Sequence, residues 1–148
     1  MVREYDTGDS QTNRFTRFAY DHDGRVTFAS YPSAVNHPAT GTRTTYDALG
    51  RPTQVTQDSE LGALTTRTEY LSGFRTRVTN PRGKQTVTSF MAFDQQTTDW
   101  PVSISHPEGA FTDIARDVFG KPTALTRRNA NSSIAVTRNY VYESPRVS

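Results

Sequence analysis

The side chains that could carry chemistry in this chain are fifteen acidic residues and three histidines, since it contains no cysteine. The histidines, His22, His37 and His106, do not have the spacing of metal ligands, and two of them precede proline at expected turns. Two carboxylates could serve glycoside hydrolysis, but the sequence singles out no pair. It also contains neither a glycine-rich phosphate loop nor a nucleophile elbow. The sequence therefore predicts no catalytic residue, no metal site and no cofactor.

The acidic residues do form a pattern, because Asp recurs with Gly three residues later and a basic residue directly after the Gly. The clearest copy begins at Tyr46 and reads Tyr-Asp-Ala-Leu-Gly-Arg-Pro. With weaker copies included, the first position falls at residues 20, 46, 70, 93, 116 and 140. A fixed period of this kind predicts one structural unit copied end to end. The residues of the repeat motif are Tyr20, Asp21, Gly24, Arg25, Tyr46, Asp47, Gly50, Arg51, Tyr70, Gly73, Arg75, Phe93, Asp94, Asp117, Gly120, Lys121 and Tyr140.

Each position of the motif has a structural role in a tight hairpin turn. The Asp carboxylate can accept hydrogen bonds from loop amides two or three residues later. The Gly suits a backbone position with positive φ, which we predict at Gly50 and Gly120. The basic residue begins the return strand and can face the loop carboxylate, while the first-position Tyr packs its ring across the hairpin.

The composition favours an all-β fold with a thin apolar layer. Leu, Ile, Val and Phe make up 27 residues and Thr alone 23, and the net charge is only +2. Turn residues also recur midway between the motif copies, so the chain is expected to be a meander of antiparallel β-hairpins in a twisted, spiralling sheet with open edges. Residues 1–19 are expected to be lead-in strands, 20–142 the hairpin repeats and 143–148 a tail.

Repeated at a period of twenty-odd residues, the Tyr-Asp-x-x-Gly-Arg motif resembles the YD repeats of Rhs proteins, insecticidal toxin-complex subunits and teneurins. The resemblance runs from Tyr20 to Tyr142, and the absence of Cys favours the bacterial Rhs type. It implies a sheet that spirals into a hollow shell, which in the bacterial members encloses a toxic C-terminal domain until delivery. The family's Asp-Pro-x-Gly self-cleavage motif is missing, so its proteolytic activity is not carried over.

Two copies depart from the family pattern. The third copy has Leu71 in place of Asp and one loop residue fewer, and the fourth has Thr97 and Thr98 where Gly and Arg are expected. Both turns are therefore predicted to be irregular.

The expected function is that of a structural shell segment without catalysis, located in the bacterial cytoplasm before export and then secreted or on the cell surface. Its expected partners are the rest of the parent shell protein, an enclosed toxin domain and, through edge strands, further copies. We expect no membrane span, and no nucleic-acid binding because acidic and basic residues are intermixed. The alternative is a cell-surface adhesion or carbohydrate-binding module, with Trp100 as the ligand contact.

Overall fold

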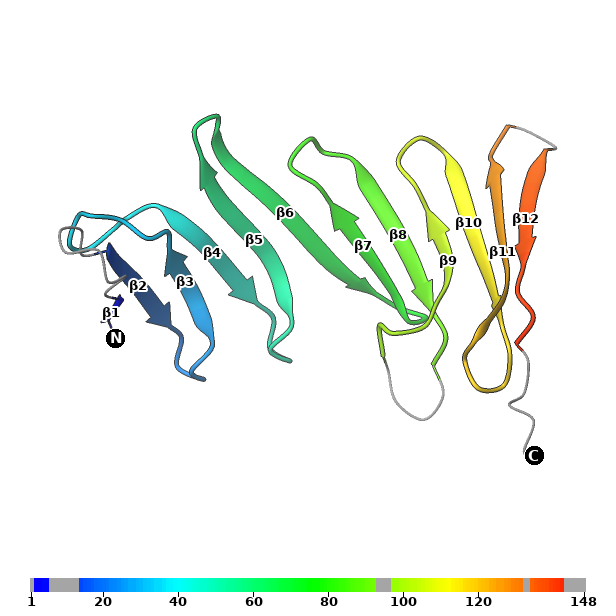
Figure 1. The fold of residues 1–148 in the computed structure, drawn as a ribbon, viewed down its shortest axis with the longest axis horizontal. Helices are drawn as coiled ribbons and strands as arrows, with labels where there is room; N and C mark the ends of the chain where they lie inside the picture. The colour runs from blue at the N-terminus through cyan, green and yellow to red at the C-terminus, as the bar shows by residue number, and fades with distance from the viewer. Residues whose placement is uncertain (1, 6–13, 93–96, 132–133, 143–148) are drawn as a thin grey trace. The chain divides into compact units, whose positions relative to one another are not determined.

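The computed structural model describes residues 2–5, 14–92, 97–131 and 134–142, and these residues form strands and turns without a helix (Figure 1). The strands in chain order are β1 (Val2–Tyr5), β2 (Arg14–Tyr20), β3 (Val26–Ser30), β4 (Gly41–Tyr46), β5 (Pro52–Ser59), β6 (Gly62–Leu71), β7 (Arg75–Thr79), β8 (Gln85–Phe90), β9 (Pro101–Ser105), β10 (Ala110–Arg116), β11 (Pro122–Asn129) and β12 (Ala135–Asn139). The expected tail at 143–148 lies outside the described residues, as does part of the lead-in segment.

The strands follow one another in the sheet in the order in which they occur in the chain. The pairings are antiparallel, as short hairpin connections require. Within the described residues β1 and β12 end the series, and the sheet does not close on itself. The predicted all-β, open meander of antiparallel hairpins is therefore confirmed.

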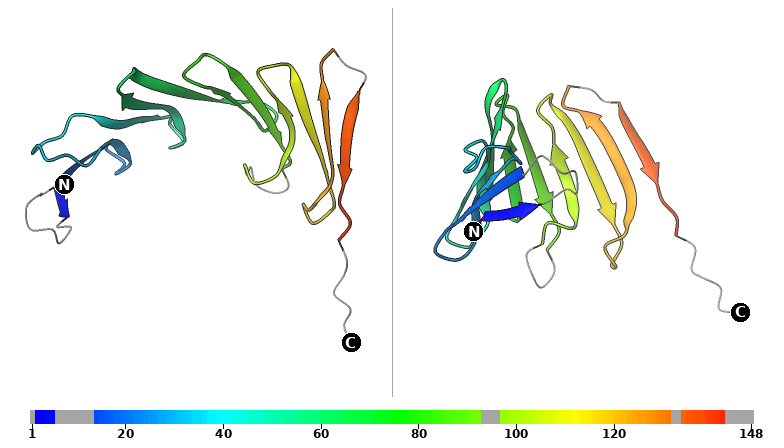
Figure 2. Two further views of the ribbon diagram at one scale, coloured as in Figure 1. Left: turned by 45° about the horizontal axis from the view of Figure 1, so that its top comes forward. Right: turned by 60° about the vertical axis from the view of Figure 1, so that its left-hand side comes forward.

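The chain divides into two compact units. The first comprises Met1–Thr68 with Asn80–Arg82, and the second comprises Glu69–Thr79 with Gly83–Ser148. The first unit contains β1 to β5 and most of β6. The second contains β7 to β12, of which β9 to β12 lie side by side in both further views (Figure 2).

Polar pairs across neighbouring strands hold each unit together. In the first unit, the Arg43 guanidinium lies 5.0 Å from the centre of the Phe28 ring and 2.7 Å from an Asp58 carboxylate oxygen. The second unit has a related set of contacts, with Arg128 over the Phe111 ring and beside Asp113, both of which lie on β10. Because cross-strand pairs of this kind each contribute modestly, stability is distributed along the sheet.

Very little of the sheet is buried. Among the described residues no hydrophobic side chain is fully buried, and the one buried polar residue is Ser30, with 6% of its surface exposed. Ser30 Oγ accepts a hydrogen bond of 2.8 Å from the backbone N–H of Arg17. The predicted thin apolar layer is therefore a single sheet wetted on both faces.

Candidate functional site

The Asp47 turn shows what the repeat motif does. The backbone N–H groups of Leu49 and Arg51 both donate to Asp47 Oδ1 at 2.9 Å, and Arg51 Nε donates to Oδ2 at 2.8 Å. The Asp47 N–H in turn donates to the Arg51 carbonyl at 2.9 Å. One carboxylate thus satisfies two loop amides and one guanidinium. The amides are those two and four residues later, whereas the sequence predicts amides two or three residues later.

Two further turns have the same geometry. Asp21 accepts from the N–H groups of Asp23 and Arg25, and Asp117 accepts from those of Phe119 and Lys121. In each turn the pairing register between the two strands shifts by one residue. The shift falls between the two residues that precede the Asp. Such a bulge accommodates a left-handed residue in a short hairpin loop.

The glycines of these turns supply the left-handed residue. The φ angle is +77° at Gly50 and +79° at Gly120, so the predicted positive φ is confirmed at both, and Gly24 has +78°. The midway turn beginning at His106 uses the same bonding. There the His106 N–H donates to the Ala110 carbonyl, and Gly109 has a φ of +75°.

The third turn is irregular, as predicted. Gly73 and Phe74 both have positive φ, and a positive φ is rare for a bulky residue such as Phe. Arg75 donates from Nε to the Ser72 carbonyl, because no Asp precedes this turn. The Phe74 carbonyl accepts a hydrogen bond of 2.9 Å from the N–H of Phe90.

Hydrogen bonding lowers the pKa of two turn carboxylates, Asp47 and Asp21. The pKa of Asp47 lies below its usual 3.8, chiefly because the Arg51 N–H donates to the carboxylate. For Asp21, desolvation raises the pKa, but hydrogen bonds from the Arg25 backbone and side chain outweigh it and the net shift is downward. The reciprocal effect raises the pKa of Arg25 through its hydrogen bond to Asp21.

These shifts predict a loss of stability in acid. A carboxylate whose pKa is lower in the folded state stabilises the fold above pH ~4 and loses this contribution as the pH falls through its folded pKa. We expect Asp47→Asn to lower the melting temperature at pH 7 by a few degrees and to have a smaller effect at pH 3. Thermal melts followed by circular dichroism at both pH values measure this. Glu60→Gln, at an exposed turn acid of the same unit, is the control; equal losses at both pH values would contradict the prediction.

Contacts between successive hairpins involve the first position of the motif. In the first unit, the Tyr46 hydroxyl donates to the Val26 carbonyl at 2.8 Å, and Arg25 lies 5.1 Å from the centre of the Tyr46 ring. Val26 begins the strand that directly follows the basic residue of the preceding hairpin. The first-position side chain therefore docks on the preceding motif copy.

The second unit repeats this docking twice. The Tyr142 hydroxyl donates to the Pro122 carbonyl at 2.8 Å, and Lys121 lies 5.3 Å from the centre of the Tyr142 ring. Arg116, which replaces Tyr in its copy, donates from Nε to the Pro101 carbonyl at 3.1 Å. A guanidinium can thus take the place of a phenol, since both reach the same kind of carbonyl.

These interactions correct the sequence register at the last copy. The sequence assigns Tyr140 to the first position, but Tyr142 docks on the preceding hairpin. The N–H of Tyr140 donates instead to the Thr123 carbonyl and continues the strand ladder. Period alone could not distinguish the two residues, because both are Tyr and lie two positions apart.

The fourth copy is also displaced. Phe93 and Asp94, which the sequence assigns to it, lie outside the described residues. Phe90 instead pairs with Pro101 after a one-residue shift, and the Met91 N–H donates to the Trp100 carbonyl at 2.8 Å. This is the pairing that Tyr46 makes with Pro52, and Asp47 with Arg51. Trp100 therefore stands where the other copies have a basic residue.

Trp100 packs on the glycine of the next hairpin. A Cβ added at Gly120 would lie 3.2 Å from both Cε2 and Nε1 of Trp100. In the first unit, a Cβ at Gly50 would lie 3.1 Å from an Arg25 guanidinium nitrogen. Trp100 is partly exposed, whereas Gly120 is buried. The residue expected to contact sugar is thus part of the same hairpin-to-hairpin packing.

The remaining chemical candidates stay apart. In the described part of the chain, no three His, Cys, Asp or Glu side chains come together as metal ligands would. His106 Nε2 lies 3.0 Å from the Thr112 hydroxyl, and His37 occupies a turn with a φ of +69°.

The residues that the structure describes include no helix with the length and apolar character needed to cross a bilayer. No protein-family model and no curated protein sequence matches this chain.

Proposed function

We propose that this chain is a structural segment of an Rhs/YD-repeat shell, which encloses a polypeptide toxin and performs no catalysis of its own. The observation that carries the proposal is a contact that recurs three times, in which the first-position side chain docks on the preceding hairpin: Tyr46 on Val26, Arg116 on Pro101 and Tyr142 on Pro122. Since the same contact recurs, each added hairpin extends the sheet by the same step. A wall built in this way grows without needing a closed core.

The edges of the sheet fit this role. Strands at the two ends of the series offer backbone groups to further strands, and further repeats or another copy of the chain would use them. The proposed location follows from the role, with assembly in the bacterial cytoplasm and delivery to the outside. A carbohydrate-binding role has less support, because the Trp100 ring lies against Gly120 of the next hairpin.

Limited proteolysis of the protein encoded by the complete gene tests the proposal. We expect the polypeptide encoded downstream of the repeats to remain protected from protease and to co-purify with them. A downstream segment that is digested at the rate of its isolated form would overturn the shell proposal. Glycan binding that is lost in Trp100→Ala but kept in Phe119→Ala, at an exposed ring of a neighbouring turn, would favour the adhesion module instead.

A further inference from the structure

The turn between β2 and β3 places an acidic residue directly before its glycine. Asp23 and Gly24 form the single Asp-Gly pair of the sequence, which contains no Asn-Gly pair. In the two equivalent turns, Leu49 and Phe119 occupy the position of Asp23. The backbone nitrogen of the following residue can attack an aspartyl carboxyl group, and glycine, which has no Cβ, hinders this attack least. The pair could therefore support a reaction between a side chain and the backbone.

The Asp23 carboxylate is accessible at the tip of the turn. Its side chain is 63% exposed, compared with 22% for Asp21 in the same turn. Leu49 and Phe119 are also exposed, by 77% and 80%, although further strands pair with both sides of their hairpins. Exposure is thus a property of this turn position, and neighbouring hairpins do not cover it.

Few contacts hold the two reacting groups. Arg25 Nη2 donates to Asp23 Oδ2, and no other group in the described part of the chain bonds this carboxylate. The Gly24 N–H donates to the Asp21 carbonyl at 3.2 Å. The Gly24 nitrogen therefore becomes free to react when one hydrogen bond inside the loop opens.

Asp58 shows the opposite situation in the same unit. It also precedes a small residue, Ser59, but its side chain is only 27% exposed. Asp58 Oδ2 accepts hydrogen bonds from the Gly41 N–H and from Arg43 Nη1. Its backbone lies in β5, which pairs with β4 and β6. Reaction at Asp58 would require the sheet itself to open.

We propose that Asp23–Gly24 is a site of spontaneous isomerisation to isoaspartate. The Gly24 nitrogen forms a bond to Asp23 Cγ, and the carboxyl oxygen leaves as water with the amide proton, which gives a cyclic imide. Water then adds to one of the two imide carbonyls. Cleavage of the new C–N bond restores Asp23, whereas cleavage of the original C–N bond leaves Gly24 attached through Cγ. The reaction needs no cofactor, and the inference does not depend on the shell proposal.

Isomerisation would lengthen the turn by one backbone carbon. The N–H groups of Asp23 and Arg25, which flank the altered link, both donate to Asp21 Oδ1. Arg25 lies 5.1 Å from the centre of the Tyr46 ring and packs on Gly50. A change in this turn therefore reaches the next hairpin, and the isomerised chain should melt at a lower temperature.

Incubation of the native chain at neutral pH for several weeks tests the inference. Trypsin, which cleaves after Arg17 and Arg25, releases residues 18–25 as one peptide, and electron-transfer fragmentation locates isoaspartate within it. We expect isoaspartate at Asp23 and none at Asp21 or Asp58. The rate should be no more than about tenfold below that of the free peptide, because an exposed turn opens locally at low cost. Asp23→Glu keeps the charge and should abolish the product, since glutamate would have to close a larger ring.

Two results would overturn the proposed site. One is an unmodified Asp23 in the native chain under conditions in which the free peptide isomerises. The other is a rate that rises with low concentrations of urea in proportion to the unfolded fraction, because the reaction would then belong to the unfolded chain. If the isomerised chain, separated by ion exchange, melts at the same temperature as the unmodified chain, the turn is not coupled to the next hairpin.

Discussion

Gly41→Ala should be among the most destabilising single substitutions in the chain. Gly41 begins β4 and pairs with Ser30 at the end of β3. A Cβ at Gly41 would collide with the Ala29 carbonyl oxygen and would lie 2.5 Å from Ser30 Cα. Both are backbone atoms, so β3 and β4 would have to move apart. We expect the free energy of unfolding to fall by about 3 kcal/mol or more, measured by urea denaturation with circular dichroism.

Two neighbouring hydrogen bonds enlarge this effect. The Gly41 N–H donates to Asp58 Oδ2 at 3.0 Å, and Ser30 Oγ accepts the Arg17 N–H at 2.8 Å. A displacement of β4 from β3 strains both, and Ser30 is the buried polar residue of the described sheet. The substitution therefore disturbs contacts to β2 and β5 as well as its own strand pair.

Gly24→Ala is the matched control in the same unit. Gly24 has a φ of +78°, and a Cβ there would meet no atom within 4 Å. Its replacement should cost only the left-handed strain, about 1 kcal/mol. Gly41 is not among the glycines with positive φ, so its larger cost would come from close approach alone. A Gly41→Ala loss no greater than that of Gly24→Ala would show that β3 and β4 tolerate a side chain between them.

The hairpin turns could be predicted from the sequence because their interactions are local. Asp47 bonds to residues two and four positions later, and Gly50 needs its positive φ within the same loop. Five consecutive residues therefore contain the information for the turn. The all-β class follows similarly from the abundance of Thr and from turns that recur before a helix could form.

The register of the fourth and sixth copies could not be predicted, because it depends on pairing between strands. Phe90 and Trp100 are ten positions apart, and the loop between them is longer than in the other turns. In the observed register Met91 stands where the motif has Asp, and Asp99 stands where it has Gly, so neither motif residue marks the turn. One sequence feature does mark the observed register: Pro101 follows Trp100, just as Pro52 follows the basic residue Arg51 of the motif.

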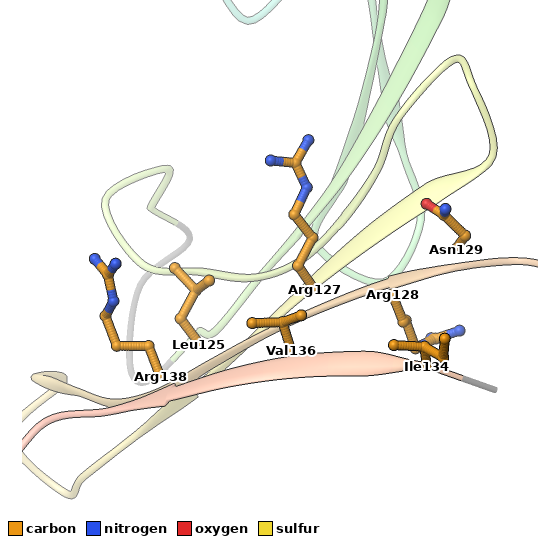
Figure 3. A pocket seen from close by; sticks show the side chains of 7 residues that line it. All are labelled: Leu125, Arg127, Arg128, Asn129, Ile134, Val136 and Arg138. Atoms are coloured by element: carbon orange, nitrogen blue, oxygen red, sulfur yellow. The ribbon is translucent and has the colours of Figure 1, made fainter. Parts of the chain in front are cut away.

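Two further features could not be predicted from the sequence: the close approach at Gly41 and the different surroundings of Arg127 and Arg128. The constraint on Gly41 comes from Ser30 in β3, eleven positions earlier, and no local pattern marks it. Arg127 and Arg128 are adjacent in sequence, yet a strand directs them to opposite faces (Figure 3), where only Arg128 meets a described carboxylate. Which arginine lacks a partner is decided by the neighbouring strand.

Trp100→Ala should give the second large effect. The ring packs on Gly120 of the following hairpin, while the Trp100 backbone carbonyl holds the Met91 N–H. Alanine keeps the backbone bond and removes the ring, exposing the buried Gly120. We expect the free energy of unfolding to fall by about 2 kcal/mol. This loss is smaller than for a fully buried Trp, because the ring is partly exposed. Urea denaturation followed by circular dichroism measures it, since the chain's single Trp is lost as a fluorophore.

Trp100→Arg should recover part of this loss, because Arg25 packs on Gly50 from the equivalent position. The reciprocal substitution is Gly120→Ala, whose Cβ would lie 3.2 Å from two atoms of the Trp100 ring. Gly83→Ala, in the same unit with a φ of +74° and no atom within 4 Å, costs only left-handed strain. Gly120→Ala should therefore lower the free energy of unfolding more than Gly83→Ala does in the wild-type chain. In the Trp100→Ala background the two glycine substitutions should lower it equally. If the two glycine substitutions cost the same with Trp100 present, the ring does not pack on the turn, and Trp100 is not the counterpart of the basic residue.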